Sequence, residues 1–223
     1  MRRNRAESLV IAGRNITVNA DFAYLSVRLT SASSDGAVNW PHSKLFPPLS
    51  MNPPASITLR HANPADAGLL ATIHAASWQA TYRGILPDEF LDDEVSIERA
   101  AFWHARMNAP DDGRRLVLIA ELASEAVGFV CVERPIGSAW GALLDNLHAL
   151  PQYQRIGVGK LLIGAAQDWA RACGETQIHL YVLEGNTAAI AFYERQGWQP
   201  AGKEPDHMGG IDVTALRYAY RLN

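Results

Sequence analysis

One short run of the chain combines two glycines with two basic residues and a glutamine. It reads Gln154-Arg155-Ile156-Gly157-Val158-Gly159-Lys160. The run follows an apolar stretch over 142–150 and leads directly into a helical pattern over 160–172. Glycines let a backbone approach a ligand closely, and the first N–H groups of a helix have no partner within it, while the helix dipole adds positive potential. We therefore expect residues 154–160 to hold a phosphate or pyrophosphate, and the protein to bind a nucleotide-like cofactor.

The spacing within this run excludes two common phosphate-binding loops. A dinucleotide-binding loop requires a glycine three residues after Gly159, where Leu162 stands. A Walker loop requires a glycine at position 154 and Ser or Thr after Lys160, but Gln154 and Leu161 occupy those places. The remaining spacing is Q-x-x-G-x-G. By itself this pattern also fits an ordinary strand-to-helix turn.

Residues that could transfer protons lie on the apolar stretch before the run. This stretch carries Asp145 and His148. Successive side chains of a strand point to opposite faces, so Asp145, Leu147 and Ala149 are expected on one face. Asn146 and His148 are expected on the other, which would turn His148 away from a site that Asp145 faces.

The elements that must position these residues alternate between strand and helix from residue 56 onward. Apolar and alternating runs predict strands over 57–61, 116–120, 126–132, 140–150, 177–182 and 213–222, the second and third of which are expected to form a hairpin through Ser124. Helical spacing predicts helices over 63–78, from 90 to 107, over 160–172 and over 186–196. Asn186 is suited to cap the last helix, and Gly174 and Gly197 to end the last two. This order predicts a mixed α/β domain with a parallel region in the middle.

The first 55 residues have a different character. They show no sustained period and contain scattered Ser, Asn and Arg followed by several prolines, a composition that predicts a flexible N-terminal extension. A short strand over 24–29 fits the pattern, and translation could begin at Met51, just before the first clear strand. We therefore divide the chain into an extension over 1–55 and a domain over 56–223.

Composition narrows the range of partners. The 223 residues carry a formal net charge of -3, which gives no reason to expect nucleic acid or a membrane surface as partner. No apolar run approaches the length that spans a bilayer. Cys131 and Cys173 lack metal-ligand spacing and are expected as buried free thiols in a reducing compartment. We expect a cytoplasmic protein without a bound metal.

Three motifs together resemble the GNAT acyl-CoA N-acyltransferases, over roughly residues 56–222. They are Leu147-His148-Ala149-Leu150-Pro151, the Q-x-x-G-x-G loop after the fourth strand, and the sequence N-T-A-A-I-A-F-Y-E-R-Q-G-W over 186–198. The last resembles the family pattern N-x-x-A-x-x-F-Y-x-x-x-G-F, with Trp198 in place of the usual Phe. The resemblance implies the GNAT fold, an α/β architecture whose mixed central sheet has splayed strands and flanking helices.

The resemblance also implies roles for particular residues. Tyr193 corresponds to the tyrosine beside the coenzyme A sulfur and would act as general acid, although helical spacing alone would favour core packing. The family often places an acidic base on the strand before the loop, which makes Asp145 the first candidate, His148 the second and Glu133 the third. For each of these three, a solvated or structural role is the alternative.

The implied cofactor is acetyl-CoA, as co-substrate. Its binding residues would be Leu147, His148, Ala149, Gln154, Arg155, Ile156, Gly157, Val158, Gly159, Lys160, Asn186 and Tyr193.

The acceptor wall would come from the first two helices and their link. The sequence W-x-x-x-Y-R-G-x-L-P over 78–87 resembles a stretch found in many small bacterial GNAT enzymes. Trp78 and Tyr82 are four residues apart and so share a helix face. They could hold an amine by cation–π contact, or they could be core aromatic residues.

The implied function is acetyl-CoA-dependent N-acetyl transfer to a primary amine by direct attack in a ternary complex. A small-molecule acceptor is favoured over a protein, because the sequence lacks long acceptor loops. Two alternatives stay open, a non-catalytic acyl-CoA-binding or sensing module and a protein N-acetyltransferase. A homodimer is compatible with the sequence, which does not fix the oligomeric state.

Overall fold

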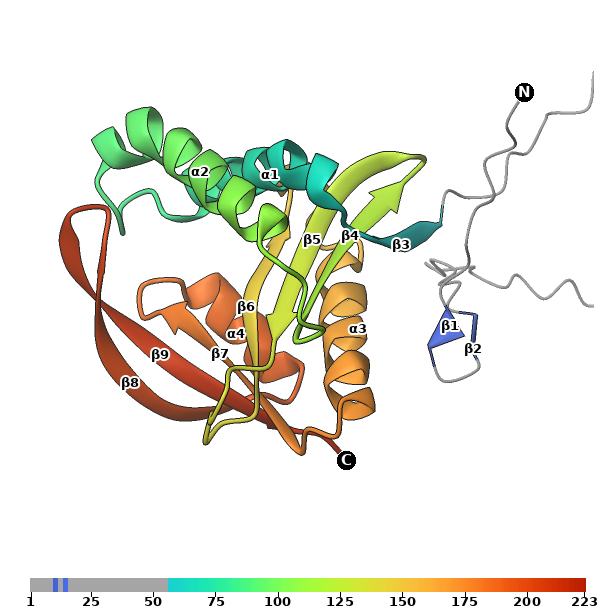
Figure 1. Ribbon diagram of the computed structural model, residues 1–223. Coiled ribbons are helices and arrows are strands. Elements are labelled where there is room, and N and C mark those ends of the chain that lie inside the picture. Colours follow the sequence, from blue (N-terminus) through green and yellow to red (C-terminus); the bar gives the residue numbers. More distant parts are fainter. Residues whose placement is uncertain (1–9, 12–13, 16–55) are drawn as a thin grey trace, which may run out of the picture.

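The computed structural model describes residues 10–11, 14–15 and 56–223 (Figure 1). Strands β1 (Val10–Ile11) and β2 (Arg14–Asn15) pair with each other in antiparallel fashion. The flexible extension expected over 1–55, the strand over 24–29 and a start at Met51 otherwise lie outside the described residues.

The domain is built on a seven-stranded mixed sheet in the order β3-β4-β5-β6-β7-β9-β8. The strands are β3 (Ile57–His61), β4 (Arg115–Leu122), β5 (Glu125–Glu133), β6 (Ala142–Ala149), β7 (Gln177–Leu183), β8 (Gln199–Met208) and β9 (Ile211–Arg221). All neighbours pair antiparallel except β6 and β7, which are parallel. The predicted hairpin through Ser124 is confirmed as the β4–β5 turn, with positive φ at Ala123 and Ser124.

Within residues 56–223, four α-helices and three short helical turns connect the strands. They are η1 (Pro64–Asp66), α1 (Ala67–Thr81), η2 (Phe90–Glu94), α2 (Val95–Asn108), η3 (Pro151–Tyr153), α3 (Val158–Ala172) and α4 (Thr187–Arg195). The expected helix signals are confirmed: Asn186 caps α4 by accepting from the Ala189 N–H at 3.1 Å, and Gly174 and Gly197 adopt positive φ after α3 and α4.

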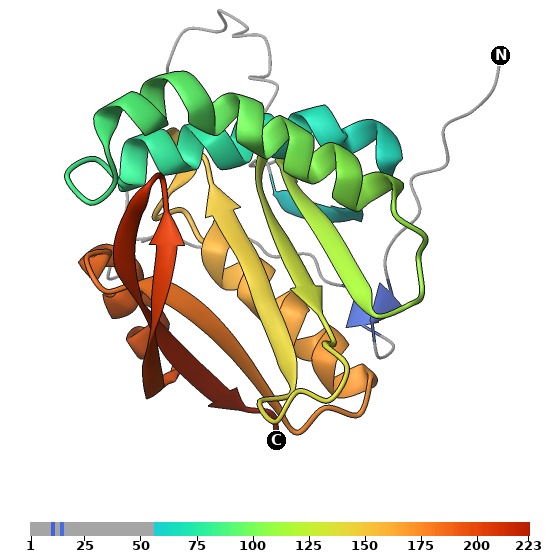
Figure 2. The ribbon, with the colours of Figure 1, turned by 60° about the vertical axis from the view of Figure 1, so that its left-hand side comes forward.

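The helices form a layer on each side of the sheet (Figures 1 and 2). One apolar cluster joins α3 and α4 to the sheet through residues such as Leu162, Tyr193 and Trp198. A second cluster joins α1 and α2 to the other face through Leu70, Trp103 and Phe129. A third lies under the α1–α2 link and includes Trp78, Leu86 and Leu183. The central strands β4 and β5 are therefore covered on both faces.

The sheet opens in its middle, between β6 and β7. The two strands pair only at Ala142 with Ile178 and at Leu143 with His179. Beyond Leu143 they diverge, so the edge of β6 that faces β7 has no strand partner there. This opening confirms the splayed mixed sheet and exposes backbone groups of β6 to ligands.

The predicted order of strands missed one element. The sequence analysis expected a single strand after α4, but β8 and β9 form a long antiparallel hairpin. Strand β8 contains Pro200, Gly202 and Pro205 and is mostly exposed. It lies at the edge of the sheet, where a missing N–H donor is tolerated, so its composition does not resemble that of a central strand.

Within residues 56–223, no helix combines the length and apolar character needed to cross a membrane.

Candidate active site

A cavity of about 720 Å³ lies where β6 and β7 separate. Residues of α1, β6, the loop before α3, β7, α4 and β8 line it. The predicted site residues that line it are Trp78, Tyr82, Asp145, Leu147, His148, Ala149, Gln154, Arg155, Gly157, Gly159, Lys160, Asn186 and Tyr193. Two predicted members of the loop do not: the Val158 side chain is buried in the core, and Ile156 is 44% exposed outside the cavity lining.

The loop before α3 leaves a series of backbone donors without partners. Among the described residues, none of the backbone N–H groups of 155–160 donates a hydrogen bond to another group of the protein. The next N–H group, that of Leu161, donates to the Gly157 carbonyl at 3.0 Å. Arg155 and Gly157 adopt positive φ, 65° and 99°, and so turn the chain sharply into the helix. The six intervening N–H groups can therefore bind an anion at the positive end of α3.

Basic side chains reinforce this end of the cavity. Arg155, Lys160 and Arg195 line it together with the loop. Gly159 allows close packing of α4, because a Cβ atom there would lie 3.3 Å from the Phe192 ring. This end of the cavity is suited to a diphosphate.

The Leu147 and Ala149 side chains pack against the core cluster under α3. Strand β5 pairs with one edge of β6, through Val130 with Leu147 and Gly128 with Ala149. The opposite edge faces the opening toward β7. A ligand with amide groups can add itself along this free edge, as an extra strand would.

The predicted face of Asp145 is wrong. Strand β6 has a bulge, because Leu144 pairs with Val132 and Asn146 with Cys131, which leaves Asp145 as an extra residue. The bulge breaks the period-two alternation. Asp145 contacts Arg106 of α2, whereas the Leu147 and Ala149 side chains pack toward α3. The expectation that His148 points away from the site is also wrong, because His148 and Asp145 both line the cavity.

Asp145 belongs to a small ionic network with α2. The Arg106 guanidinium lies 2.9 Å from the Asp145 carboxylate and 2.6 Å from that of Glu133. Burial raises the pKa of Asp145 above its ordinary value, and the Arg106 charge opposes that rise. Glu133, the third candidate base, is part of this network but does not line the cavity.

His148 is held between two residues of α1. Its Nδ1 atom lies 3.0 Å from the Ser77 Oγ, and its ring stacks on that of His74 with centroids 4.1 Å apart. Burial, followed by the nearby Arg99 charge, lowers the pKa of His148 to about 3. At neutral pH the imidazole is therefore uncharged, and it is a much weaker base than an ordinary histidine.

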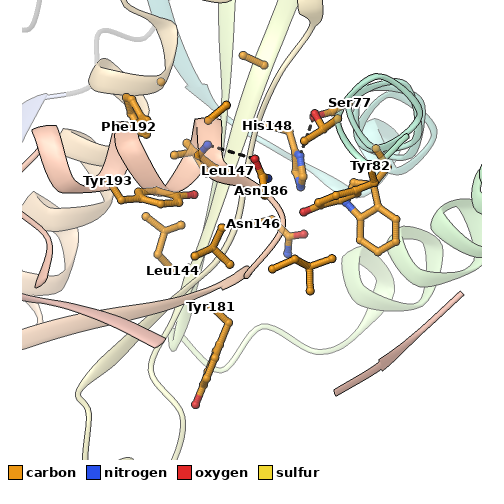
Figure 3. A pocket seen from close by; sticks show the side chains of 18 of the residues that line it. Ser77, Tyr82, Leu144, Asn146, Leu147, His148, Tyr181, Asn186, Phe192 and Tyr193 are labelled. Atoms are coloured by element: carbon orange, nitrogen blue, oxygen red, sulfur yellow. Dashed lines mark hydrogen bonds between the residues drawn. The ribbon is translucent and has the colours of Figure 1, made fainter. Parts of the chain in front are cut away.

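Tyr193 packs on Phe192 and Trp198 and is only 8% exposed. Its hydroxyl group points into the cavity toward that of Tyr82 (Figure 3). Burial raises the pKa of Tyr193, and the neighbouring Tyr82 adds to the effect. The phenol therefore stays protonated at every physiological pH and is available as a proton donor.

Trp78 and Tyr82 form the wall opposite Tyr193. Their rings meet edge to face with centroids 5.4 Å apart, which confirms that they share a helix face. Trp78 is buried in the third core cluster and also lines the cavity. Burial raises the pKa of Tyr82, and a hydrogen bond with Asn186 opposes the rise. The Asn186 Oδ1 atom also accepts the hydrogen bond from the Ala189 N–H that caps α4 (Figure 3).

Sequence reasoning missed several residues of the site. His74, Ser77, Tyr181 and Asp206 line the cavity but belong to none of the three motifs, and Arg195 lies within the motif over 186–198 without having been assigned a role. His74 lies on the helix predicted over 63–78, where no motif marks it as a site residue. Between residues 56 and 223, no cluster of His, Cys, Asp and Glu is arranged to hold a metal ion.

Comparison of the sequence with known proteins identifies its family and several relatives. The model of the acetyltransferase (GNAT) family matches residues 74–198, which is more than half of the chain. A probable N-acetyltransferase of Mycobacterium tuberculosis is 25% identical over 169 residues, covering 74% of this chain and 94% of that protein. The spermidine N(1)-acetyltransferase of Thermoplasma acidophilum is 25% identical over 146 residues, covering 65% of this chain and 89% of that protein.

Solved structures share the fold. The PaiA N-acetyltransferase of Thermoplasma acidophilum, solved in complex with coenzyme A, superimposes with a TM-score of 0.58. It is 23% identical and is matched over 74% of this chain and 99% of its own.

Proposed function

Because the chain belongs to the acetyltransferase (GNAT) family, we propose that it transfers the acetyl group of acetyl-CoA to a small primary amine. The transfer is direct, with both reactants bound in the cavity at once. One observation carries the proposal: the loop over 155–160, whose N–H groups are unpartnered among the described residues, contributes four residues to the lining of the cavity that Asp145 and Tyr193 also line.

In this proposal, acetyl-CoA occupies the opening between β6 and β7. The diphosphate accepts hydrogen bonds from the loop amides, with Arg155 and Lys160 adding charge. The pantetheine amides bond to the free edge of β6 near Leu147 and Ala149. The acetyl thioester then lies between Asp145 and the Tyr193 hydroxyl. That solved relatives hold coenzyme A or acetyl-CoA supports this choice of co-substrate.

The chemistry requires two proton transfers. The amine nitrogen attacks the thioester carbonyl carbon, and its proton passes to Asp145, directly or through a water molecule. The tetrahedral intermediate collapses with cleavage of the C–S bond, and the departing thiolate takes the proton of the Tyr193 hydroxyl. General acid and base catalysis each contribute about 10²–10⁴-fold. Alignment of the two reactants contributes further.

The acceptor end of the cavity is suited to a protonated amine. Asp145 and Asp206 line the cavity, as do the aromatic residues Trp78, Tyr82 and Tyr181. Carboxylates and aromatic faces both attract cations. The name of the Thermoplasma relative, a spermidine acetyltransferase, supports a small amine as acceptor. We also keep the proposal of a cytoplasmic location.

The test combines binding with turnover. Acetyl-CoA should raise the melting temperature of the protein, and a panel of primary amines should include at least one that releases free coenzyme A, read as thiol. If neither coenzyme A nor acetyl-CoA binds at millimolar concentration, the proposal is wrong. Binding without thiol release for any amine would favour the acyl-CoA-sensing alternative, and acetylation of lysines or N-termini in cell extracts would favour a protein acceptor.

A further inference from the structure

His74 is a buried histidine at the acceptor end of the cavity. It lies on α1, is 1% exposed and lines the cavity beside Ser77 and Trp78. The Trp103 Nε1 atom of α2 lies 3.0 Å from the His74 Nδ1 atom. An indole N–H can only donate, so Nδ1 must accept. The neutral ring therefore carries its proton on Nε2.

This Nε2–H group has no hydrogen-bond partner among the described residues. A buried donor without a partner costs free energy, about 1–3 kcal/mol, and such groups in native proteins need an explanation. The other buried side-chain nitrogens without partners belong to Arg99, Arg106 and Trp198, and none of these lines the cavity. His74 does line it, although its Nε2 atom is covered, so a bound molecule can supply the missing acceptor once a small shift of the ring uncovers Nε2.

The charge beside His74 favours an acceptor atom that is negative or strongly polarised. Arg99 of α2 stacks over the rings of Trp78 and Phe102, 4.6 and 4.9 Å from their centroids, and its side chain is only 12% exposed. Its Nη2 atom pairs with Glu98, while its Nε–H is unpartnered. Burial, the neighbouring His148 and the Arg99 charge lower the pKa of His74, which keeps the ring neutral and Nε2–H a donor at working pH.

We propose that His74 selects the acceptor by donating its Nε2–H to an oxygen atom of the substrate, so that the acceptor is a small amine that also carries a carboxylate or another hydrogen-bond-accepting oxygen. The amine would face Asp145 and the oxygen would face His74. This inference rests on the proposed acetyl transfer and adds the chemical class of its acceptor. Trp103 acts through His74, by fixing which ring nitrogen carries the proton.

The test compares amines that differ only in the oxygen function. Leucine, leucinol and isopentylamine form one series, and phenylalanine, phenylalaninol and phenethylamine form a second. The wild-type protein should prefer the oxygen-bearing members, with kcat/KM ratios of about tenfold or more over the bare amine, as expected for one hydrogen bond in a buried site. A wild-type preference for the bare amines in both series overturns the inference.

Variants assign the preference to His74. His74→Phe keeps an aromatic ring but removes the donor, and should lower the ratio about tenfold, mainly through the KM of the oxygen-bearing amine. His104→Phe is the matched control, because His104 lies exposed on α2 outside the cavity, and should leave the ratio unchanged. A ratio unchanged in His74→Phe overturns the inference.

Two further measurements keep the test decisive. If His74→Phe does not fold, Trp103→Phe keeps the histidine but frees its Nδ1 from the indole donor, and should also lower the ratio; an unchanged ratio counts against the inference. If turnover is too slow, calorimetric titration of leucine and isopentylamine into the coenzyme A complex should give the same preference, and equal affinities overturn it. Because binding of acetyl-CoA is measured separately, failure of the acetyl-transfer proposal is distinguishable from failure of this one.

Discussion

At the scale of single residues, burial acts on the proposed acid and base in complementary ways. It raises the pKa of both Tyr193 and Asp145. For the phenol this means that the proton is present when a thiolate leaves, and also that the phenol is a weaker acid than an exposed tyrosine. For the carboxylate it means a stronger base, provided that the pH is high enough to keep it ionised. His148 is affected in the opposite sense, which makes Asp145 the better candidate base.

The first prediction concerns the Tyr193 hydroxyl. Tyr193→Phe should lower kcat about 10²–10⁴-fold while acetyl-CoA affinity stays within a few-fold, because only the proton donor is lost. Steady-state kinetics and calorimetry measure the two quantities. Tyr218→Phe is the matched control, since its hydroxyl donates to Glu194 at 2.9 Å and its side chain lies outside the cavity lining. Equal losses of kcat in the two variants would argue against Tyr193 as the acid.

The second prediction concerns the pH dependence of catalysis. The Arg106 charge lowers the pKa of Asp145, so its removal in Arg106→Gln should raise that pKa further. The base acts when ionised, and activity is lost as the pH falls through its pKa. The acidic limb of kcat/KM against pH should therefore move to higher pH in Arg106→Gln.

A matched variant separates this effect from a general loss of charge. Arg134 pairs with Glu175 at 2.9 Å, away from the cavity lining, and Arg134→Gln should leave the acidic limb in place. If the acidic limb of kcat/KM against pH does not move in Arg106→Gln, Asp145 is not the base.

At the scale of elements, the entrance to α3 combines sharp backbone geometry with ligand binding. Gly157 precedes the helix with a φ of 99°, and Gly174 follows it with a φ of 81°. A Cβ atom at either position would meet nothing within 4 Å. Both glycines are therefore needed for conformation rather than for space, but only Gly157 lines the cavity.

The third prediction compares alanine substitutions at these two glycines. Gly157→Ala and Gly174→Ala should each destabilise the fold by a similar amount, about 1–3 kcal/mol, because each forces a side chain into the left-handed region. Only Gly157→Ala should also lower the affinity for acetyl-CoA, at least several-fold, because it changes the direction of the N–H groups in the loop. Thermal unfolding and calorimetry give the two readouts. Similar affinities in both variants would exclude this loop as the diphosphate site.

At the scale of the whole molecule, the site depends on one opening in an otherwise continuous sheet. Strands β3 to β6 form one antiparallel part and β7, β9 and β8 another, joined only through two residue pairs of β6 and β7. Helices α1 and α2 cover one face and α3 and α4 the other (Figure 2). The cavity therefore draws its walls from both layers and both halves of the sheet.

The fourth prediction follows from the residue at which the seven-stranded sheet begins. All seven strands of the sheet and the three core clusters lie after residue 56. A chain that starts at Met51 should keep its melting temperature within a few degrees and its kcat/KM within about twofold of the full chain, since every strand of the seven-stranded sheet and all three core clusters are retained. Calorimetry and kinetics on both chains check this. A cooperative loss of stability on truncation would instead show that the first 50 residues belong to the domain.

The sequence determined the local features of this protein. The loop over 154–160, the Asn186 cap, the glycines at helix ends and the β4–β5 hairpin depend on neighbours along the chain, and each could be predicted from residue types at fixed spacing. The same local motifs led to the correct family. Their physical basis is backbone conformation and hydrogen bonding within a few residues.

Only the tertiary structure decided which side chains share the site. The bulge at Asp145 results from pairing with β5, and no period within β6 could reveal it. Edge strand β8 is stable because β9 pairs with it, despite its prolines. His74, Ser77 and Arg106 reach the site or its base because α1 and α2 cross the splayed sheet there. Contacts between distant segments depend on how whole elements pack, and a single sequence does not encode that packing in any local spacing.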